Sequence, residues 1–314
     1  MPVCKTAEEE GPLDDGADVE TARLCQRRRL AAAEAFMSKP ICLITGATDG
    51  IGKVTATALA GKGYAVVLAA RNETKAASVT KEIVASTGNR DVGYLAADLR
   101  SLAQLRRLTE TFTMRYPRLD VLINNAGIIM PERVLTEDGY ETTFQVNYLA
   151  QFYLTQLLLG ELEKSPLGRV VNLSSSVYRA GKFDPDNLQR EQRFSTIGTY
   201  AASKLYVLLF TIELAQRLKP THVIANAVHP GIVRTPMMRE AQGVFRTVSY
   251  AALPFSRSPD KGAASSVFLA GSPHAAQISG QYFANGKVRH VKTAFNTPEN
   301  RDLLWKLSMD ACRL

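Results

Sequence analysis

The feature that most constrains this chain is an apolar run, a glycine-rich turn and an alanine-rich segment that follow one another directly. The run Ile41–Ile44 is short and apolar, as expected of a buried strand, and the pattern from Lys53 to Ala60 is helical. Between them stands the sequence Thr45-Gly46-Ala47-Thr48-Asp49-Gly50-Ile51-Gly52. Glycines also mark ordinary loops, but this position between a strand and a helix is typical of dinucleotide sites.

Each glycine of this turn has an expected role. Gly46 permits a tight turn, Gly50 lets the backbone approach a pyrophosphate, and Gly52 lets the helix pack closely on the strand. The N-terminus of the helix then faces the phosphate groups. We therefore expect cofactor contacts from Thr45, Gly46, Thr48, Asp49, Gly50, Ile51 and Gly52.

Strand and helix patterns alternate through the rest of the chain. Short apolar strand patterns occur at 65–70, 93–97, 121–123, 169–173, 223–228 and 281–284. Helical patterns occur at 75–85, 102–116, 139–162, 205–218, 263–270 and 300–309. Repeated β-α units predict an α/β fold with a single doubly wound parallel sheet and helices on both faces. Ligands of such sheets bind beyond the carboxyl ends of the strands.

Size and charge limit the classes of protein that remain. The chain has 314 residues, of which 46% are hydrophobic, enough for one large α/β domain. The formal net charge is +8, and residues 1–36 hold more acidic than basic side chains, so the remaining body is more basic still. Such a body suits a phosphate-bearing cofactor or a nucleic acid. No recognised nucleic-acid motif is visible, so we expect no specific nucleic acid partner.

Cysteine spacing and hydrophobicity indicate the compartment. The four cysteines lie far apart, without the paired spacing of zinc sites or small disulfide scaffolds, so no metal site is predicted. Free cysteines favour a reducing environment, which we interpret as cytoplasmic. No run reaches the roughly 18 apolar residues that a membrane span needs, and the N-terminus lacks the order of a secretory signal. We therefore expect no transmembrane segment.

The end of the second strand indicates which dinucleotide binds. An NAD site usually has a carboxylate there, whereas this chain has Arg71 followed by Asn72. Arg71 can accept the 2′-phosphate of NADP with a planar, permanently charged group, so NADP(H) is expected and NAD(H) is less favoured. A solvated strand end is the competing interpretation of Arg71. Asp98 offers a carboxylate to the adenine amino group. Further expected cofactor contacts along the same sheet edge are Asn72, Leu99, Asn125, Ala126, Gly127, Pro230, Gly231, Val233 and Thr235.

A tyrosine and a lysine stand four residues apart at the start of a long apolar helix pattern. On a helix, Tyr200 and Lys204 share one face, where the ammonium group favours the phenolate and lowers the tyrosine pKa. A free phenol titrates near about 10, so such a lowering would suit proton exchange near neutral pH. The pair alone also occurs as an ordinary surface pair, so the other motifs decide its meaning.

Four motifs in order resemble those of the short-chain dehydrogenase/reductases, over about Lys39 to the C-terminus. Thr45–Gly52 fits T-G-x-x-x-G-x-G, and Asn124–Gly127 reads N-N-A-G. Tyr200–Lys204 fits Y-x-x-x-K, and Pro230-Gly231 fits the P-G after the sixth strand. The resemblance implies a Rossmann-type fold, a nicotinamide dinucleotide, and a homo-oligomer formed through the tyrosine helix and the helix before it.

The resemblance also implies a catalytic set made of Asn147, Ser175, Tyr200 and Lys204. Tyr200 would exchange a proton with the substrate oxygen while hydride moves between the substrate carbon and the nicotinamide. Lys204 would lower the pKa of Tyr200 and hold the nicotinamide ribose, and Ser175 would hydrogen-bond the substrate oxygen. Asn147 would bind a water that passes the proton onward. In the run 174–176 the resemblance points to the second serine, and strand alternation agrees, because it puts Ser175 opposite its neighbours.

The segment between Ser175 and Tyr200 is longer than in many members of the family. Residues 182–196 are similar to the branch that contains retinol dehydrogenases and the WW-domain oxidoreductase, which implies a lipophilic alcohol or carbonyl substrate. Residues 236–258 lack periodicity and are expected to form a substrate lid, with a packed surface subdomain as the alternative. Residues 1–37 are expected to be a disordered or partly helical extension, which leaves 38–314 as a single catalytic domain.

Together these patterns predict an NADP(H)-dependent oxidoreductase that acts on a small-molecule alcohol or carbonyl. The alternative is a dinucleotide-binding sensor or scaffold with little or no turnover, which the charged N-terminal extension favours. The intact catalytic set argues against that alternative, because a sensor does not need Tyr200 and Lys204. His229 precedes a proline and has no paired ligand, so we interpret it as structural.

Overall fold

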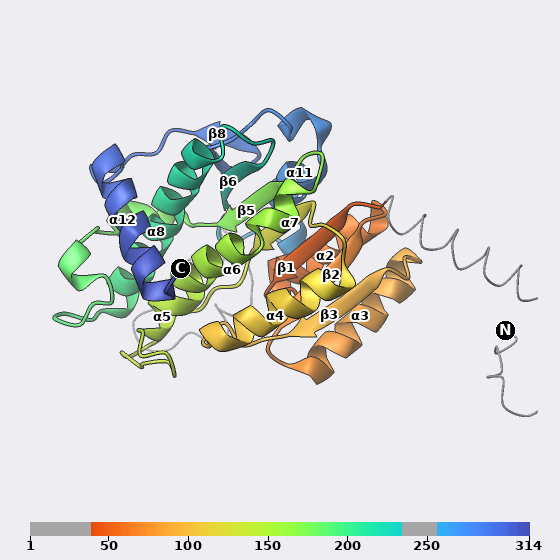
Figure 1. Cartoon of the computed structure of the whole chain (residues 1–314), viewed down its shortest axis with the longest axis horizontal. Helices are drawn as coiled ribbons and strands as arrows, with labels where there is room; N and C mark the ends of the chain where they lie inside the picture. The colour runs from red at the N-terminus through yellow and green to blue at the C-terminus, as the bar shows by residue number, and fades with distance from the viewer. Residues whose placement is uncertain (1–38, 234–255) are drawn as a thin grey trace, which may run out of the picture. The chain divides into compact units, whose positions relative to one another are not determined.

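A single sheet forms the centre of the described chain (Figure 1). The computed structural model describes residues 39–233 and 256–314. Within these residues the sheet has eight strands in the order β3-β2-β1-β4-β5-β6-β7-β8, all parallel to their neighbours except β8. The strands are β1 (Ile41–Thr45), β2 (Ala65–Ala70), β3 (Val92–Ala96), β4 (Val121–Asn124), β5 (Arg169–Leu173), β6 (Ile224–His229), β7 (Tyr282–Ala284) and β8 (Lys287–Arg289).

Helices cover both faces of the sheet, which confirms the predicted fold class. Alternation along β1 shows the two faces: Ile44 packs in a core cluster with Leu59 of α2 and Leu269 of α11, whereas the equally buried Leu43 points the other way. On the first face lie α2 (Gly50–Gly61), α3 (Glu73–Thr87) and α11 (Pro259–Gly271). On the second lie α4 (Leu102–Arg115), α6 (Ala150–Leu157) and α8 (Thr196–Arg217).

Helix α8 carries the tyrosine–lysine pair and is both long and apolar. Among the described helices it is the one whose length and composition would suit a membrane span. From the sequence we had expected no segment to meet these criteria. However, 72% of the 18-residue window that meets the test is buried within the protein. Burial between the sheet and its neighbours therefore explains the apolar character of α8.

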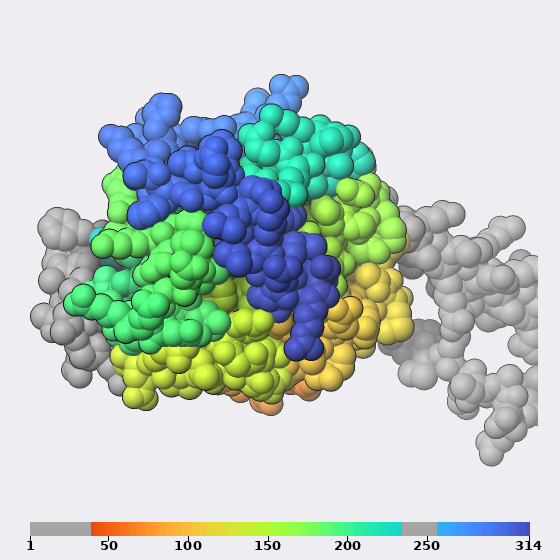
Figure 2. All heavy atoms as spheres, turned by 60° about the vertical axis from the view of Figure 1, so that its left-hand side comes forward, coloured from red at the N-terminus to blue at the C-terminus, as the bar shows by residue number. Residues whose placement is uncertain are grey.

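The C-terminal helix α12 (Pro298–Cys312) lies on the outer side of α8. Trp305 packs against Phe152 of α6 at 5.1 Å between ring centroids, and against Phe210 of α8 at 6.0 Å. Figure 2 shows this helix in dark blue, lying across the surface of the described chain. The aromatic face that α6 and α8 share is thus covered within one chain, while the expected homo-oligomer stays a prediction.

Two details of the secondary structure were not expected from the sequence. The helical region expected at 139–162 begins at α5 (Thr142–Phe144) and contains a π-helical stretch, η1 (Gln145–Leu149), before α6. The chain then bends at Leu158 and continues as α7 (Leu159–Glu163). Strand β8 was not expected, because three exposed residues that begin and end with a basic side chain lack an apolar strand pattern.

Short helical turns complete the described part of the chain. They are η2 (Ser176–Ala180), η3 (Pro185–Asn187) and η5 (Pro273–Ala275). The expected extension at 1–37 lies outside the described residues, as do Thr235 and most of the expected lid at 236–258.

Candidate active site

The glycine turn after β1 has a backbone that only glycine accommodates easily. Gly46 and Gly50 have φ angles of +64° and +50°, in the left-handed region. A Cβ atom added to Gly52 would lie 2.3 Å from the carbonyl oxygen of Gly46 and 2.5 Å from Nδ2 of Asn125. The first turn of α2 therefore closes tightly on the turn before it, and its free backbone N–H groups face the carboxyl end of the sheet.

Two side chains lock this turn to the end of β4. The hydroxyl oxygen of Thr45 accepts hydrogen bonds from the backbone N–H groups of Asn125 and Ala126, at 3.0 Å and 3.1 Å. In return, Nδ2 of Asn125 donates to the carbonyl oxygens of Thr45, at 2.9 Å, and Gly46, at 3.0 Å. These residues of the expected cofactor site thus hold the backbone of the turn in place.

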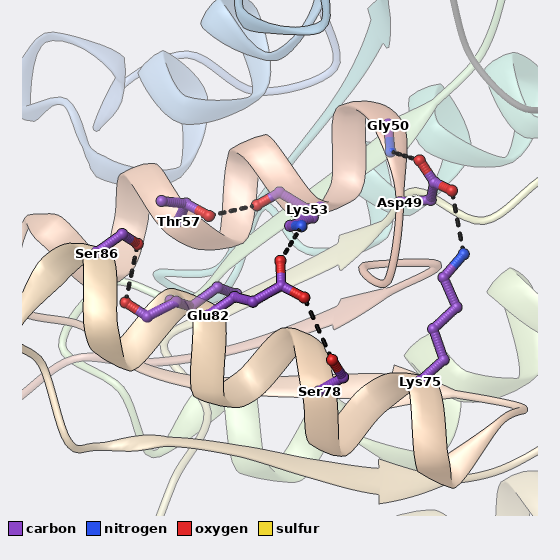
Figure 3. Close-up of polar contacts among 9 residues, drawn as sticks. Asp49, Gly50, Lys53, Thr57, Lys75, Ser78, Glu82 and Ser86 are labelled. Carbon is purple, nitrogen blue, oxygen red and sulfur yellow. Dashed lines mark hydrogen bonds and ion pairs between the residues drawn. The ribbon is translucent and has the colours of Figure 1, made fainter.

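The start of α2 is tied to α3 by two ion pairs, which Figure 3 shows. Asp49 is the N-cap of α2: its Oδ1 accepts from the backbone N–H of Gly50 at 2.7 Å, and its Oδ2 accepts from Lys75 Nζ of α3 at 3.0 Å. Further along the two helices, Lys53 Nζ donates to Glu82 at 2.5 Å. Lys75 was not expected near the glycine turn, although its place in the first turn of α3, shortly after Arg71, was a signal in the sequence.

Charged side chains cluster where the adenosine end of a dinucleotide is expected. Arg71 is exposed at the end of β2, and Asn72 caps α3 by accepting from the backbone N–H of Lys75 at 2.8 Å. Partial burial raises the pKa of Asp98, but hydrogen bonds and charge from Arg100, together with the charge of Arg71, lower it overall. Because the charge of Arg71 lowers the pKa of Asp98, the two side chains must lie near each other.

Asp98 and Leu99, both expected to contact the cofactor, already have partners within the protein. Both carboxylate oxygens of Asp98 accept from the guanidinium of Arg100, the shortest of these contacts being 2.7 Å. The carbonyl oxygen of Leu99 accepts from Nε2 of Gln145 at 3.4 Å. Their roles toward adenine remain predictions, and Asp98 would have to share its carboxylate with Arg100.

Ser175, Tyr200 and Lys204 come together at the carboxyl end of β5. The hydroxyl of Ser175 lies close enough to that of Tyr200 to lower the pKa of the tyrosine. Lys204 is 3% exposed, its Nζ donates to the carbonyl oxygen of Leu173 at 2.9 Å, and it lies 5.7 Å from the centroid of the Tyr200 ring. Because these strands are parallel, the carboxyl end of β5 lies beside the carboxyl end of β4, which in turn lies beside the carboxyl end of β1. The three side chains thus share one sheet edge with the glycine turn.

The expected lowering of the Tyr200 pKa by Lys204 is not found. Burial raises the pKa of Tyr200 to about 12, although its hydrogen bond with Ser175 acts in the opposite direction. Burial also lowers the pKa of Lys204 to about 8. The lysine ammonium lies over the ring and is engaged with Leu173, so burial outweighs any charge effect that it has on the phenol.

Asn147 lies in the π-helical stretch η1, and its amide group is engaged with protein atoms. Its Oδ1 accepts from the backbone N–H of Ile128 at 2.7 Å, while Nδ2 donates to the carbonyl oxygen of Ile128 at 2.9 Å and to Ser203 Oγ at 3.1 Å. Ser203 in turn donates to the carbonyl oxygen of Tyr200 at 2.7 Å. π-helical stretches are frequent at functional sites. The side chain of Asn147 thus links the loop after β4 to the tyrosine helix.

Ser203 was not recognised from the sequence, although it lies inside the Tyr200–Lys204 motif. The other serines near Ser175 have different tasks. Ser174 is buried and donates to the carbonyl oxygen of Lys204 at 2.7 Å. The backbone N–H of Ser176 donates to Nδ1 of His229 at 3.2 Å.

His229 has the structural contact expected of it. Burial, with the nearby charges of Arg257 and Arg179, lowers its pKa to about 4, so the ring is neutral at pH 7 and can accept the hydrogen bond from Ser176. Gly231, two residues later, has a φ of +88° and turns the chain at the end of β6. Pro230, Gly231 and Val233 therefore lie at the same sheet edge, as expected from the sequence.

The described residues fit a nicotinamide dinucleotide. Gly46 and Gly52 have no space for a Cβ atom, so α2 lies close to the turn. The N–H of Gly50 is capped by Asp49, and the first turn of a helix offers further N–H groups without a carbonyl partner in the helix, which suit a pyrophosphate. The described residues contain no group of three or more His, Cys, Asp or Glu side chains that could hold a metal ion.

Comparison with known proteins identifies the class. The family model described as short chain dehydrogenase matches residues 40–243. Human retinol dehydrogenase 14 is 38% identical over 302 residues, which cover 90% of this chain and 89% of the relative. Mouse retinol dehydrogenase 12 is 39% identical over 273 residues, covering 86% and 85%. The solved Pseudomonas aeruginosa RhlG/NADP active-site complex has a TM-score of 0.64 at 27% identity, covering 79% of this chain and 95% of that one.

The chain therefore belongs to the short-chain dehydrogenase family, which confirms the resemblance of its four motifs. It is an oxidoreductase of this family, and its similarity to retinol dehydrogenases agrees with the branch expected from residues 182–196.

Proposed function

We propose that this protein is an NADP(H)-dependent oxidoreductase that interconverts an alcohol and a ketone or aldehyde on a lipophilic small molecule. The observation that carries this proposal is the closeness of the Ser175 and Tyr200 hydroxyls, with Lys204 over the tyrosine ring, on the sheet edge that also bears the glycine turn. A substrate oxygen between the two hydroxyls could exchange a proton with Tyr200 and be polarised by Ser175.

The four residues divide the work of the reaction. In the reducing direction, the substrate carbon receives the hydride that the bound dinucleotide supplies. Tyr200 donates its phenolic proton to the substrate oxygen and recovers one afterwards, while Ser175 donates a hydrogen bond to the same oxygen. Lys204, held by the carbonyl oxygen of Leu173, supplies positive charge beside the phenol and a donor for the nicotinamide ribose. Asn147 positions the tyrosine helix through Ser203.

Four observations support the cofactor and the substrate class. Arg71 at the end of β2 suits a 2′-phosphate, and the RhlG structure is a complex with NADP. The similar curated proteins are named retinol dehydrogenases, whose substrate is an apolar alcohol. Ile197, in the first turn of α8, and Ile232, after Gly231, are 41% and 44% exposed, so apolar side chains are available to a lipophilic ligand at this edge.

The test is a turnover assay that follows NADPH absorbance at 340 nm with retinal and a series of straight-chain aldehydes and ketones. We expect NADPH-linked reduction that rises with chain length and is lost in Tyr200→Phe. Turnover that Tyr200→Phe retains in full would contradict the assigned mechanism, and NADPH binding without turnover on the series would favour a sensor or scaffold.

A further inference from the structure

One ion pair joins the glycine turn of the cofactor site to helix α3. Asp49 belongs to the glycine turn itself, and its Oδ2 holds Lys75 Nζ of α3 at 3.0 Å (Figure 3). The side chains of Asp49 and Lys75 are 42% and 50% exposed. The pair thus spans the gap between the two helices at the surface, beside the carboxyl ends of β1 and β2.

These two segments are the ones between which an adenosine ribose lies in a dinucleotide fold. The glycine turn approaches the pyrophosphate, and the residues after the second strand contact the 2′ position of the ribose. Asp49 comes directly before Gly50, and Lys75 lies in the first turn of α3, which begins shortly after Arg71. A carboxylate at this point repels a 2′-phosphate, and an ammonium group attracts it.

We propose, on the basis of the function proposed above, that the Asp49–Lys75 pair sets the preference of this protein between NADPH and NADH. Lys75 is a specificity-determining residue, because its charge cancels that of Asp49 and leaves Arg71 as the net positive charge that faces the 2′-phosphate. Asp49 limits the preference, because its carboxylate keeps a negative charge close to the same phosphate. NADH lacks this phosphate, so its binding does not depend on the pair.

A second ion pair provides a matched control. Lys53 and Glu82 join the same two helices at 2.5 Å, with side chains that are 36% and 53% exposed. Figure 3 shows this pair further along both helices, away from the glycine turn. If an ion pair acts only by holding α2 on α3, then loss of either lysine should change the binding of both dinucleotides in the same way.

The experiment measures dissociation constants of NADPH and NADH by calorimetry for the wild type, Lys75→Met, Asp49→Asn, the double variant and Lys53→Met. We expect Lys75→Met to weaken NADPH about fivefold and to leave NADH within about twofold. Asp49→Asn keeps a side chain that can cap α2, and should tighten NADPH by a similar factor. The double variant should return the NADPH/NADH ratio to near the wild-type value, and Lys53→Met should not change it. These differences should shrink as salt concentration rises.

The outcomes separate this inference from the proposed function. Equal weakening of NADPH and NADH by Lys75→Met, or an unchanged ratio, would overturn the role of the pair while leaving the oxidoreductase proposal in place. A wild type that binds both dinucleotides equally, with Lys75→Met still selectively weaker for NADPH, would support the pair and contradict the NADP assignment. A wild type that binds neither would overturn both.

Discussion

The site at the carboxyl edge of the sheet has two halves that are built in different ways. We call the glycine turn and the residues that hold it the cofactor half, and Ser175, Tyr200 and Lys204 the catalytic half. In the cofactor half, the backbone does most of the positioning: Gly46 and Gly52 allow close approach, and Thr45 and Asn125 bind backbone atoms of the turn. In the catalytic half, side chains from separate elements meet, because Ser175 follows β5 and Tyr200 lies 25 positions later on α8.

This difference determines how each half responds to change. A backbone site tolerates few substitutions at its glycines, since an added Cβ has no free space. A side-chain site can lose one functional group and keep its shape, because the helix and strand that carry it remain packed. The predictions below test this contrast, beginning with the catalytic half.

The largest effect is expected from Tyr200→Phe. Removal of the phenolic hydroxyl takes away the proposed general acid and base, so kcat should fall about 1,000-fold, within the range measured for such groups. NADPH affinity and the melting temperature should change little, because the ring stays in place. Steady-state kinetics together with calorimetry would check this.

Tyr206→Phe on the same helix is the matched control. The hydroxyl of Tyr206 donates to the carbonyl oxygen of Lys182 at 3.4 Å and does not reach Ser175. We expect kcat within about threefold of the wild type, since this substitution removes no group that acts on substrate. A loss as large as that of Tyr200→Phe would mean that either change acts through packing of α8.

Gly52→Ala should be the most damaging change in the cofactor half. The new Cβ would lie 2.3 Å from the carbonyl oxygen of Gly46, so the turn must shift, at a cost of about 3 kcal/mol in unfolding free energy. Gly61→Ala, at the other end of α2, is the control: its Cβ meets only Thr87 at 3.9 Å and should be neutral or stabilising. Urea denaturation compares the two, and equal effects would contradict the backbone argument.

His229 should make stability depend on pH at the end of β6. Its folded pKa of about 4 lies below the ordinary value of 6.5, so between these values the unfolded chain binds a proton that the folded chain does not. Stability is therefore lost as pH falls through this window, by about 2–3 kcal/mol at pH 4.5. His229→Gln should lose correspondingly less between pH 7 and 4.5. If both proteins lose the same unfolding free energy between pH 7 and 4.5, the lowered pKa of His229 would be contradicted.

The smallest effect is expected from Thr45→Val. This change removes the hydroxyl that accepts from the N–H groups of Asn125 and Ala126, at a cost of about 1–2 kcal/mol in stability. Thr57→Val on α2 removes only a hydroxyl that donates to the carbonyl oxygen of Lys53, and should cost less. Of these two variants, only Thr45→Val should lower dinucleotide affinity, because Thr45 holds the glycine turn and Thr57 does not.

The local motifs could be predicted from the sequence because each is contained in a few consecutive residues. The strand, turn and helix from Ile41 to Gly61 were expected nearly at their observed bounds. The family resemblance pointed to Ser175, and strand alternation agreed with that choice. The order of the four motifs also implied the family that the comparisons show.

The remaining features depend on contacts between distant segments. Pairing of Asp49 with Lys75 and of Asn147 with Ser203 arises only when the helices pack, so local patterns place each residue but do not show which partner it meets. The π-helical stretch replaces a continuous helix for the same reason, since Asn147 bonds to the loop at Ile128. The direction of the Tyr200 pKa was wrong because the sequence shows the neighbouring lysine but not the degree of burial.

The most direct test of the central claim is transfer of deuterium from C4-deuterated NADPH to the carbonyl compound that is turned over fastest. We predict that mass spectrometry finds one deuterium on the carbinol carbon of the product with wild-type protein, and about 1,000-fold slower product formation with Tyr200→Phe. A product without deuterium on that carbon, or the absence of any product with wild-type protein that binds NADPH, would contradict the claim that this chain is an NADP(H)-dependent oxidoreductase.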